Sequence, residues 1–232
     1  MTASSEFDPE TVETVTLDSF TTLVDVHGPT REALAEHVTE PDPVATLWRS
    51  RAVDYRMVAT FLDAYEPYRQ TTREALEYAL TVHGHDLPDE AVEEVVGTFE
   101  ELPVFEDVRG SIERLVDAGY DVAVLSNGEP DLLGSIVERA GIEDLLSAVV
   151  SADEIRAYKP AAAIYEHGAE RTDTPIDRIA HAATPWYDVY GAMGAGMQGI
   201  WVNRRGRPWD TFDGEPSLIV DSLAGLADAF DA

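Results

Sequence analysis

The order of predicted elements constrains the fold of this chain more than any other feature. Residues 12–17 alternate and are rich in Val and Thr, which is typical of a β-strand that ends at Asp18. From residue 30 to about 102, hydrophobic residues recur at helical spacing. After Pro103, short apolar strands alternate with helices to the end of the chain. This alternation predicts an α/β fold with a doubly wound parallel sheet.

The position of the helical segment predicts the domain organisation. We expect a Rossmann-like core domain, residues 1–25 and 104–232, with an all-helical cap domain, residues 26–103, inserted after the first strand. Right-handed crossovers bring the carboxyl ends of parallel strands to one edge, where ligands bind, so the cap would cover that edge. The helices expected in it are residues 30–38, 43–65, 70–83 and 88–101.

Composition limits what the protein contacts and where it works. The chain has 45 acidic and 16 basic residues, a net charge of -29, so nucleic acid would be repelled. An acidic surface with a single Lys is what we expect of a protein adapted to concentrated salt, where charge repulsion is screened. The absence of Cys excludes disulfides and a thiol nucleophile. No signal peptide or apolar run of about 18 residues is present, so we expect a cytoplasmic protein.

Reactive side chains occur in four segments at or shortly after the predicted strands. Asp18 follows the first strand, Ser126-Asn127-Gly128 the second, and Tyr158-Lys159-Pro160 enters a later helix. Asp188 ends the fourth segment, which begins at His181. A carboxylate, a hydroxyl, an amide, an ammonium group and a second carboxylate can together support nucleophilic displacement followed by hydrolysis.

In this order, the four segments resemble the motifs of the haloacid dehalogenase superfamily over nearly the whole chain. They are most similar to those of the L-2-haloacid dehalogenases. Superfamily members that hydrolyse phosphate esters mostly have a second Asp two residues after the nucleophile and bind magnesium with it. This chain has Phe20 there, which cannot bind a hard cation, and the dehalogenases have an aromatic residue. Residues 47–49 and 201–206 also resemble dehalogenase segments.

The resemblance implies a catalytic role for four residues. Asp18 would attack C2 of a 2-haloacid, release halide and form an ester. Lys159 would keep Asp18 ionised, and Thr22 would help to position it. Asp188 would help to activate the water that cleaves the ester at the carboxyl carbon of Asp18. Attack at that carbon inverts C2 only once, so an (S)-2-haloacid would give an (R)-2-hydroxyacid.

The resemblance also implies a substrate-binding set without a metal or cofactor. Arg49 and Asn127 would receive the halide, and Ser126 with nearby backbone N–H groups would hold the substrate carboxylate. Tyr165 and Phe20 would line the site. Periodicity alone does not select Arg49, because it lies off the expected buried stripe of its helix. That stripe is Val44, Trp48, Tyr55, Val58 and Leu62.

Three positions depart from the dehalogenase pattern. Thr21 occupies a position that is usually Gly, which would alter the loop beside Asp18. Ala183 and Pro185 occupy positions that are usually Ser and Asn, whose side chains would hold the hydrolytic water or Asp188. Thr184 is a candidate replacement. The alkylation half of the reaction is therefore better equipped than the hydrolytic half.

Two other functions stay open at this point. A phosphatase of the same superfamily would need bound magnesium, against which Phe20 argues. A catalytically weak binding protein with the same fold is favoured by Ala183 and Pro185. For the dehalogenase, the expected partners are a small anionic 2-haloalkanoate and halide, without nucleic acid or membrane, and the resemblance implies a homodimer formed through the cap.

Overall fold

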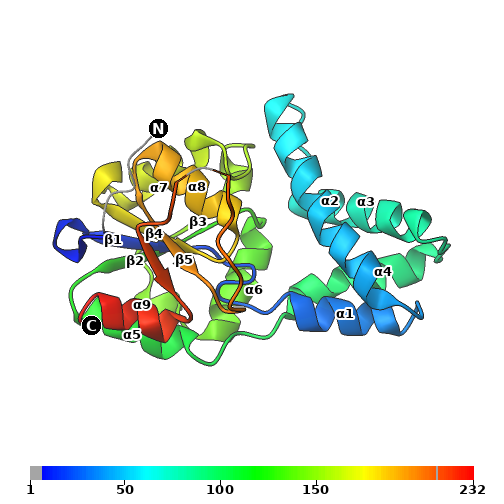
Figure 1. Ribbon diagram of the computed structural model, residues 1–232, viewed down its shortest axis with the longest axis horizontal. Helices are drawn as coiled ribbons and strands as arrows, with labels where there is room; N and C mark the ends of the chain where they lie inside the picture. Colours follow the sequence, from blue (N-terminus) through cyan, green and yellow to red (C-terminus); the bar gives the residue numbers. More distant parts are fainter. Residues whose placement is uncertain (1–6, 213) are drawn as a thin grey trace.

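The computed structural model of the chain describes residues 7–212 and 214–232, which form an α/β part and a helical block beside it (Figure 1). In these residues, six strands form one sheet in the order β3-β2-β1-β4-β5-β6, and all neighbouring strands are parallel. The expected doubly wound parallel sheet is therefore confirmed. The strands are β1 (Thr14–Leu17), β2 (Asp121–Ser126), β3 (Ala148–Ser151), β4 (Ile179–Ala183), β5 (Gln198–Val202) and β6 (Leu218–Val220).

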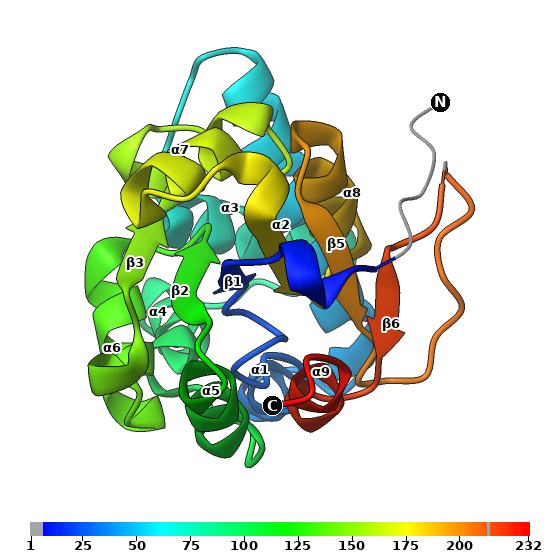
Figure 2. The same cartoon turned by 90° about the vertical axis from the view of Figure 1, so that its left-hand side faces the viewer.

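Helices cover both faces of the sheet (Figure 2). On one face lie α5 (Val108–Asp117), α6 (Pro130–Ala140) and α9 (Leu223–Ala229), and on the other lie α7 (Ala162–Thr172) and α8 (Trp186–Ala195). Every residue of the central strands β1 and β4 is buried, as expected for parallel strands covered on both faces. Short 3-10 helices are η1 (Pro9–Thr11), η3 (Glu143–Leu145), η4 (Ala152–Glu154) and η5 (Ile176–Arg178).

The strand order locates a topological switch point. Successive strands after β1 extend the sheet first to one side, through β2 and β3, and then to the other, from β4 to β6. The carboxyl ends of β1 and β4 therefore flank the point where the direction of winding reverses, and loops leaving such a point form a crevice. Asp18 follows β1, and Asp188 lies in the first turn of α8, which follows β4.

All four expected helices occur between β1 and α5, so the all-helical insertion is confirmed. They are α1 (His27–Ala35), α2 (Pro41–Phe61), α3 (Tyr68–Val82) and α4 (Asp89–Gly97), and the 3-10 helix η2 (Thr98–Glu101) follows. Proline in the first turn of α2 loses no helical hydrogen bond. A hydrogen bond of 2.8 Å from Trp48 Nε1 to the Thr72 carbonyl ties α2 to α3. None of the helices in the described residues has the length and apolar composition that crossing a membrane requires.

The buried face of α2 differs from the expected stripe. Val44 and Trp48 are buried, but Val58 and Leu62 are 54% and 64% exposed. From Trp48 onward the buried face continues at four-residue spacing through Ala52 to Arg56, which is only 7% exposed. The expectation for Val58 and Leu62 was wrong because it followed the hydrophobic residues, whereas packing against α3 buries a charged residue instead.

Candidate active site

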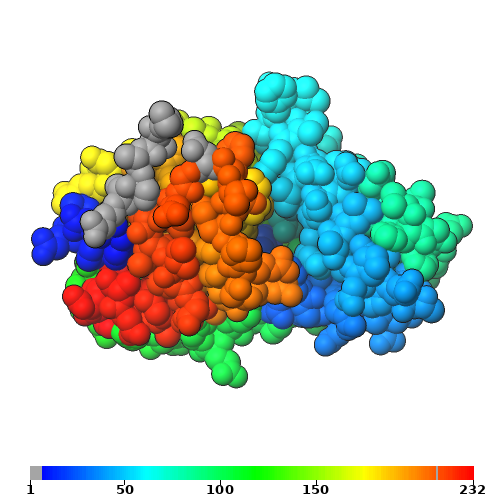
Figure 3. Space-filling view, viewed as in Figure 1, coloured from blue at the N-terminus to red at the C-terminus, as the bar shows by residue number. Residues whose placement is uncertain are grey.

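Asp18 follows β1 at the carboxyl edge of the sheet. Figure 3 shows a recess along the boundary between the α/β part and the helical block. The side chain of Asp18 is nearly buried. Its backbone N–H donates to the Ala182 carbonyl of β4 at 3.0 Å, which continues the strand pairing one residue beyond β1. Thr22 Oγ1 donates to Asp18 Oδ2 at 3.1 Å. The carboxylate is thus fixed by a backbone contact and a hydroxyl donor.

Lys159 lies between two carboxylates. Its Nζ donates to Asp188 Oδ2 at 2.7 Å, to Asp18 Oδ1 at 3.2 Å and to the Leu125 carbonyl at 2.6 Å. The lysine side chain is only 1% exposed. The single lysine of the chain therefore satisfies all three ammonium hydrogens inside the protein. The structure brings together Asp18, Lys159 and Asp188, which are distant in the sequence.

Asp188 is held by a second set of donors. Tyr165 Oη donates to Asp188 Oδ1 at 2.8 Å, and His181 Nε2 lies 3.0 Å from the same oxygen. Asp188 is in the first turn of α8, where the helix dipole favours an anion, but the N-cap residue is Pro185. A role of Asp188 as the helix N-cap is therefore not observed. Its carboxylate is free to serve the buried network.

The two carboxylates differ in their electrostatics. Burial raises the pKa of Asp18, and the Lys159 charge only partly offsets this. Burial also opposes ionisation of Asp188, but Lys159 and His181 outweigh it and hold the pKa of Asp188 well below its usual value. Lys159 Nζ is also closer to Asp188 than to Asp18, which likewise favours ionisation of Asp188 over that of Asp18. Asp188 is thus the more readily ionised of the two carboxylates, and Asp18 the more readily protonated one.

Ser126 and Asn127 lie beside this network at the end of β2. Ser126 Oγ is 2.6 Å from Ser19 Oγ and accepts the Gly128 backbone N–H at 3.2 Å. Asn127 Oδ1 accepts the Lys159 backbone N–H at 2.9 Å, so the amide orients its NH₂ group away from this contact. Asn127 thereby fixes the loop that carries Lys159.

Aromatic rings form a wall between Asp18 and the helical block. Phe20 stacks on Tyr68 of α3 with ring centroids 4.8 Å apart. The guanidinium of Arg56 also packs on the Tyr68 ring, with Cζ 3.6 Å from the ring centroid. Arg56 Nε donates to Thr71 Oγ1 at 3.1 Å and Nη2 donates to Thr72 Oγ1 at 2.5 Å. Sequence reasoning did not select Arg56 or Tyr68, since nothing in the helical spacing marks Arg56 as buried.

Arg49 is half-buried in α2 and, within the described residues, makes no ion pair or hydrogen bond through its side chain. Burial and the charges of Arg205 and Arg207 lower the pKa of Arg49. Burial and the Arg49 charge also lower the pKa of His27 to about 4. Arg49 therefore lies near charges of both signs, the cations Arg205 and Arg207 and the carboxylates of Asp42 and Asp25. The structure does not join it to Asp18 by a contact.

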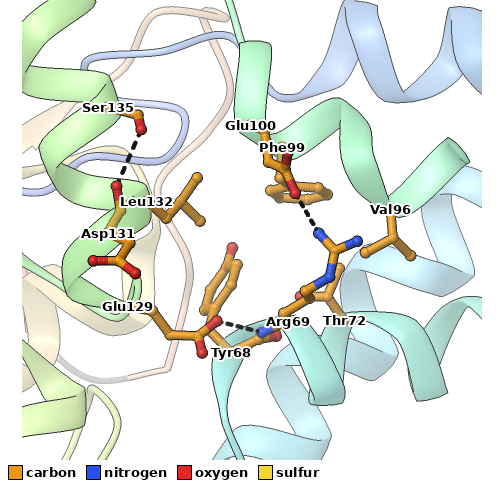
Figure 4. A pocket seen from close by; sticks show the side chains of 10 residues that line it. All are labelled: Tyr68, Arg69, Thr72, Val96, Phe99, Glu100, Glu129, Asp131, Leu132 and Ser135. Carbon is orange, nitrogen blue, oxygen red and sulfur yellow. Dashed lines mark hydrogen bonds and ion pairs between the residues drawn. The ribbon is translucent and has the colours of Figure 1, made fainter. Parts of the chain in front are cut away.

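Tyr68 also lines a cavity of about 410 Å³ between the helical block and the α/β part (Figure 4). Its lining includes Glu100, Glu129 and Asp131, and Arg69 bridges the first two, through its guanidinium to Glu100 and its backbone N–H to Glu129. Glu129 belongs to the α/β part and Arg69 to the helical block, so this bridge links the two. Because acidic side chains dominate the rim, the cavity does not suit a small anion.

The structure shows the consequences of the three residues that depart from the dehalogenase pattern, Thr21, Ala183 and Pro185. Thr21 adopts a left-handed backbone with φ of 67°, so the loop keeps a glycine-like conformation with a β-branched residue. Thr184 does not replace the missing donors, because its single hydroxyl hydrogen is shared between the Thr21 and Val202 carbonyls, each 3.0 Å from Oγ1. Ala183 and Pro185 have no side-chain donor for Asp188. His181 and Tyr165 supply donors instead.

Phe20 lies where a metal-binding carboxylate would be needed. Among the residues that the structure describes, no group of three or more His, Asp or Glu side chains is arranged to hold a metal ion. Asp18 and Asp188 approach each other through Lys159, whose ammonium fills the space between them.

Comparisons with known proteins identify the family of this chain. The model of the haloacid dehalogenase-like hydrolase family matches residues 12–181. The (S)-2-haloacid dehalogenase 4A of Burkholderia cepacia is 28% identical over 191 residues, covering 82% of this chain and 83% of that protein. Haloacetate dehalogenase H-2 of Moraxella sp. (strain B) is 27% identical and covers 93% and 96%.

Solved structures agree as well. The crystal structure of an L-2-haloacid dehalogenase superimposes with a TM-score of 0.90 at 27% sequence identity, over 95% of this chain and 99% of that one. The family model covers well over half of the sequence, and the segments that it spans include Asp18, Ser126 and Lys159. The chain therefore belongs to the haloacid dehalogenase-like hydrolase family.

Proposed function

We propose that this protein hydrolyses short (S)-2-haloacids to (R)-2-hydroxyacids and halide through a covalent ester on Asp18. The observation that carries this proposal is the buried Asp18 carboxylate, held by Thr22 and by a Lys159 ammonium that it shares with Asp188. Relatives named as (S)-2-haloacid dehalogenases support it across nearly the full chain. The helical block would act as the cap, with residues 26–103 as its extent.

In the first half of the reaction, Asp18 attacks C2 of the substrate. An Asp18 carboxylate oxygen forms a bond to C2, and the carbon–halogen bond breaks with its electron pair on the departing halide. In-line displacement sends the halide away from Asp18, toward the helical block. Lys159 keeps the nucleophile ionised, and Ser126 with the neighbouring backbone N–H groups receives the substrate carboxylate. Arg49 and the Asn127 NH₂ group receive the halide, with Phe20 and Tyr165 lining the site.

In the second half, water attacks the carboxyl carbon of the Asp18 ester. Asp188 takes one water proton, and the bond breaks between this carbon and the ester oxygen that Asp18 placed on C2. The departing oxygen takes up that proton, and the new Asp18 carboxyl loses the other to solvent. The sum is haloacid anion plus water giving hydroxyacid anion, halide and a proton.

The acidic surface gives this proposal an electrostatic condition. A net charge of -29 repels an anionic substrate at long range, and salt shortens that range. We propose that the enzyme works in concentrated salt, where the local charges of Arg49 and Lys159 outweigh the distant acids. A cytoplasmic location is part of the proposal and agrees with a chain that has no Cys to oxidise.

A homodimer is the quaternary structure that we propose. Its support is an apolar surface at the end of α2, where Phe61 is 88% exposed next to Val58 and Leu62. Large exposed apolar side chains in a cluster are typical of contact surfaces. Sedimentation of the wild type and of Phe61→Asp tests it: a wild type that sediments as a monomer at micromolar concentration would exclude it.

The proposed activity is tested with the two enantiomers of 2-bromopropionate. Bromide release from the (S) enantiomer, with (R)-lactate as the product, is the expected result. Release from neither enantiomer would contradict the proposal. A parallel screen of phosphate esters with magnesium tests the phosphatase alternative, which Phe20 disfavours. Stoichiometric bromide without turnover would instead favour the catalytically weak protein to which Ala183 and Pro185 point.

A further inference from the structure

The Asp188 carboxylate receives three side-chain hydrogen bonds, and one of them has no counterpart in the expected site. Lys159 donates to Oδ2, while Tyr165 and His181 share Oδ1. His181 is completely buried in β4 and pairs in register with Thr16 of β1. Its imidazole therefore lies inside the sheet edge, and the strand pairing fixes its position.

The hydrogen-bond partners determine the form of the imidazole. Asp188 is ionised and only accepts hydrogen bonds, so His181 Nε2 must carry the hydrogen in the 3.0 Å contact. The other ring nitrogen, Nδ1, lies 2.9 Å from Thr16 Oγ1, which can donate to it. Both ring nitrogens are thus used inside the protein. Neither is left to accept a proton directly from a water beside Asp18.

The residues between His181 and Asp188 provide no other side-chain donor to the Asp188 carboxylate. Ala183 and Pro185, which precede Asp188 on the same connection, have no polar side chain. The Thr184 hydroxyl is committed to two backbone carbonyls. Without His181, Oδ1 would keep only the Tyr165 hydroxyl.

We propose that His181 is a positioning residue for the hydrolytic half of the reaction, donating its Nε2 hydrogen to Asp188 so that this carboxylate keeps the orientation needed to take a proton from water. This inference rests on the proposed function. Its physical basis is the change that follows alkylation. The Asp18 ester carries no charge, so Lys159 loses one of its two anionic partners and is drawn toward Asp188. The His181 hydrogen bond holds Oδ1 against that pull.

Alkylation makes no such demand on His181. Attack by Asp18 on C2 needs the Asp18 carboxylate, with Lys159 and Thr22 as its direct partners. His181 Nε2 donates to Asp188 at 3.0 Å and lies 3.5 Å from Lys159 Nζ, and His181 makes no hydrogen bond to Asp18 in the described residues. Its removal should therefore slow ester hydrolysis and spare ester formation.

Two substitutions separate the contacts of the imidazole. In His181→Gln, the amide extends to the position of Nε2 and can still donate to Asp188. In His181→Asn, the amide reaches only as far as Nδ1, so it keeps the Thr16 contact and loses Asp188. Rapid mixing with (S)-2-bromopropionate, followed by bromide detection and intact-protein mass, measures ester formation and hydrolysis separately. Thr14→Val, which removes another buried hydroxyl contact of β1, to Thr174, is the control for general damage to the sheet.

For His181→Asn we expect a burst of one bromide per chain at close to the wild-type rate. Steady turnover should then fall about 10²-fold while the Asp18 ester accumulates. His181→Gln should recover at least about a tenth of wild-type turnover, and Thr14→Val should leave both phases unchanged. An equal loss of burst and steady rates in His181→Asn, or unchanged turnover, would overturn this inference alone. No bromide release from the wild type would overturn the proposed function as well.

Discussion

The Lys159 ammonium lies 2.7 Å from Asp188 Oδ2, and both side chains are 1% exposed. This buried pair sets the chemistry of the nearby Asp18 carboxylate, which reaches the same ammonium at 3.2 Å. One cation thus serves two anions. Asp188 has the shorter contact and the additional donors, which favour its ionised form. Asp18 is the carboxylate that we propose forms the bond to the substrate.

The acid limb of the alkylation rate should report the raised pKa of Asp18. Only the carboxylate attacks carbon, so the rate of the bromide burst should fall as the pH falls through a pKa above the usual 3.8. Thr22→Val removes a hydrogen bond to the charged form and should move this limb to higher pH. Thr22→Ser keeps the hydroxyl and is the control. A limb at or below pH 3.8 in the wild type, measured by rapid mixing, would contradict the assignment.

Lys159→Met should harm both folding and activity. Removing the cation leaves two buried carboxylates unpaired, which should lower the free energy of unfolding by about 3–5 kcal/mol. The burst rate should fall at least about 10²-fold, because Asp18 becomes harder to ionise. Lys159→Arg keeps the charge but not the compact shape and should not restore the rate. Urea unfolding and rapid mixing measure the two effects, and wild-type burst kinetics in Lys159→Met would refute the site.

Thr21→Gly should stabilise the protein. Thr21 has a φ of 67°, a conformation that is strained for a β-branched residue and free for glycine. We expect the free energy of unfolding to rise by about 1 kcal/mol. Thr21→Ala keeps a Cβ atom and should recover less. A lower stability of the Gly variant in urea unfolding would show that Thr21 is held by contacts that outweigh its backbone strain.

Stability should increase steeply with salt. The chain carries a net charge of -29, and most of its acidic groups lie on the surface, so screening lowers their mutual repulsion. We expect a clearly higher Tm in molar KCl than at low ionic strength. Sucrose solutions of matched water activity control for effects other than charge. Equal Tm values at low and molar salt would contradict adaptation to concentrated salt.

The sequence was informative wherever function depends on residues near strand ends. The strand before Asp18 and the alternation after Pro103 predicted the sheet, because strands that alternate with helices form a parallel sheet with few possible topologies. Once the sheet forms, its carboxyl edge brings Asp18, Lys159 and Asp188 together. These residues could therefore be selected before their contacts were known.

Residues whose roles arise from packing between elements were harder to predict. Arg56 is buried only because Thr71, Thr72 and the Tyr68 ring of α3 receive its guanidinium, and a charged residue on a helix is normally solvated. His181 gains its role from strand register, which sets it beside Thr16. Its strand neighbours Ala180 and Ala182 point to the other face of the sheet, so they gave no signal for this contact.

The most direct test of the account is the intact mass of wild type and Asp18→Asn after incubation with (S)-2-bromopropionate in high salt, with free bromide measured in parallel. The account predicts catalytic bromide release by the wild type. It also predicts that Asp18→Asn neither releases bromide nor gains the mass of a propionate group. Bromide release that persists in Asp18→Asn, or a wild type that forms no adduct and releases no bromide, would contradict it.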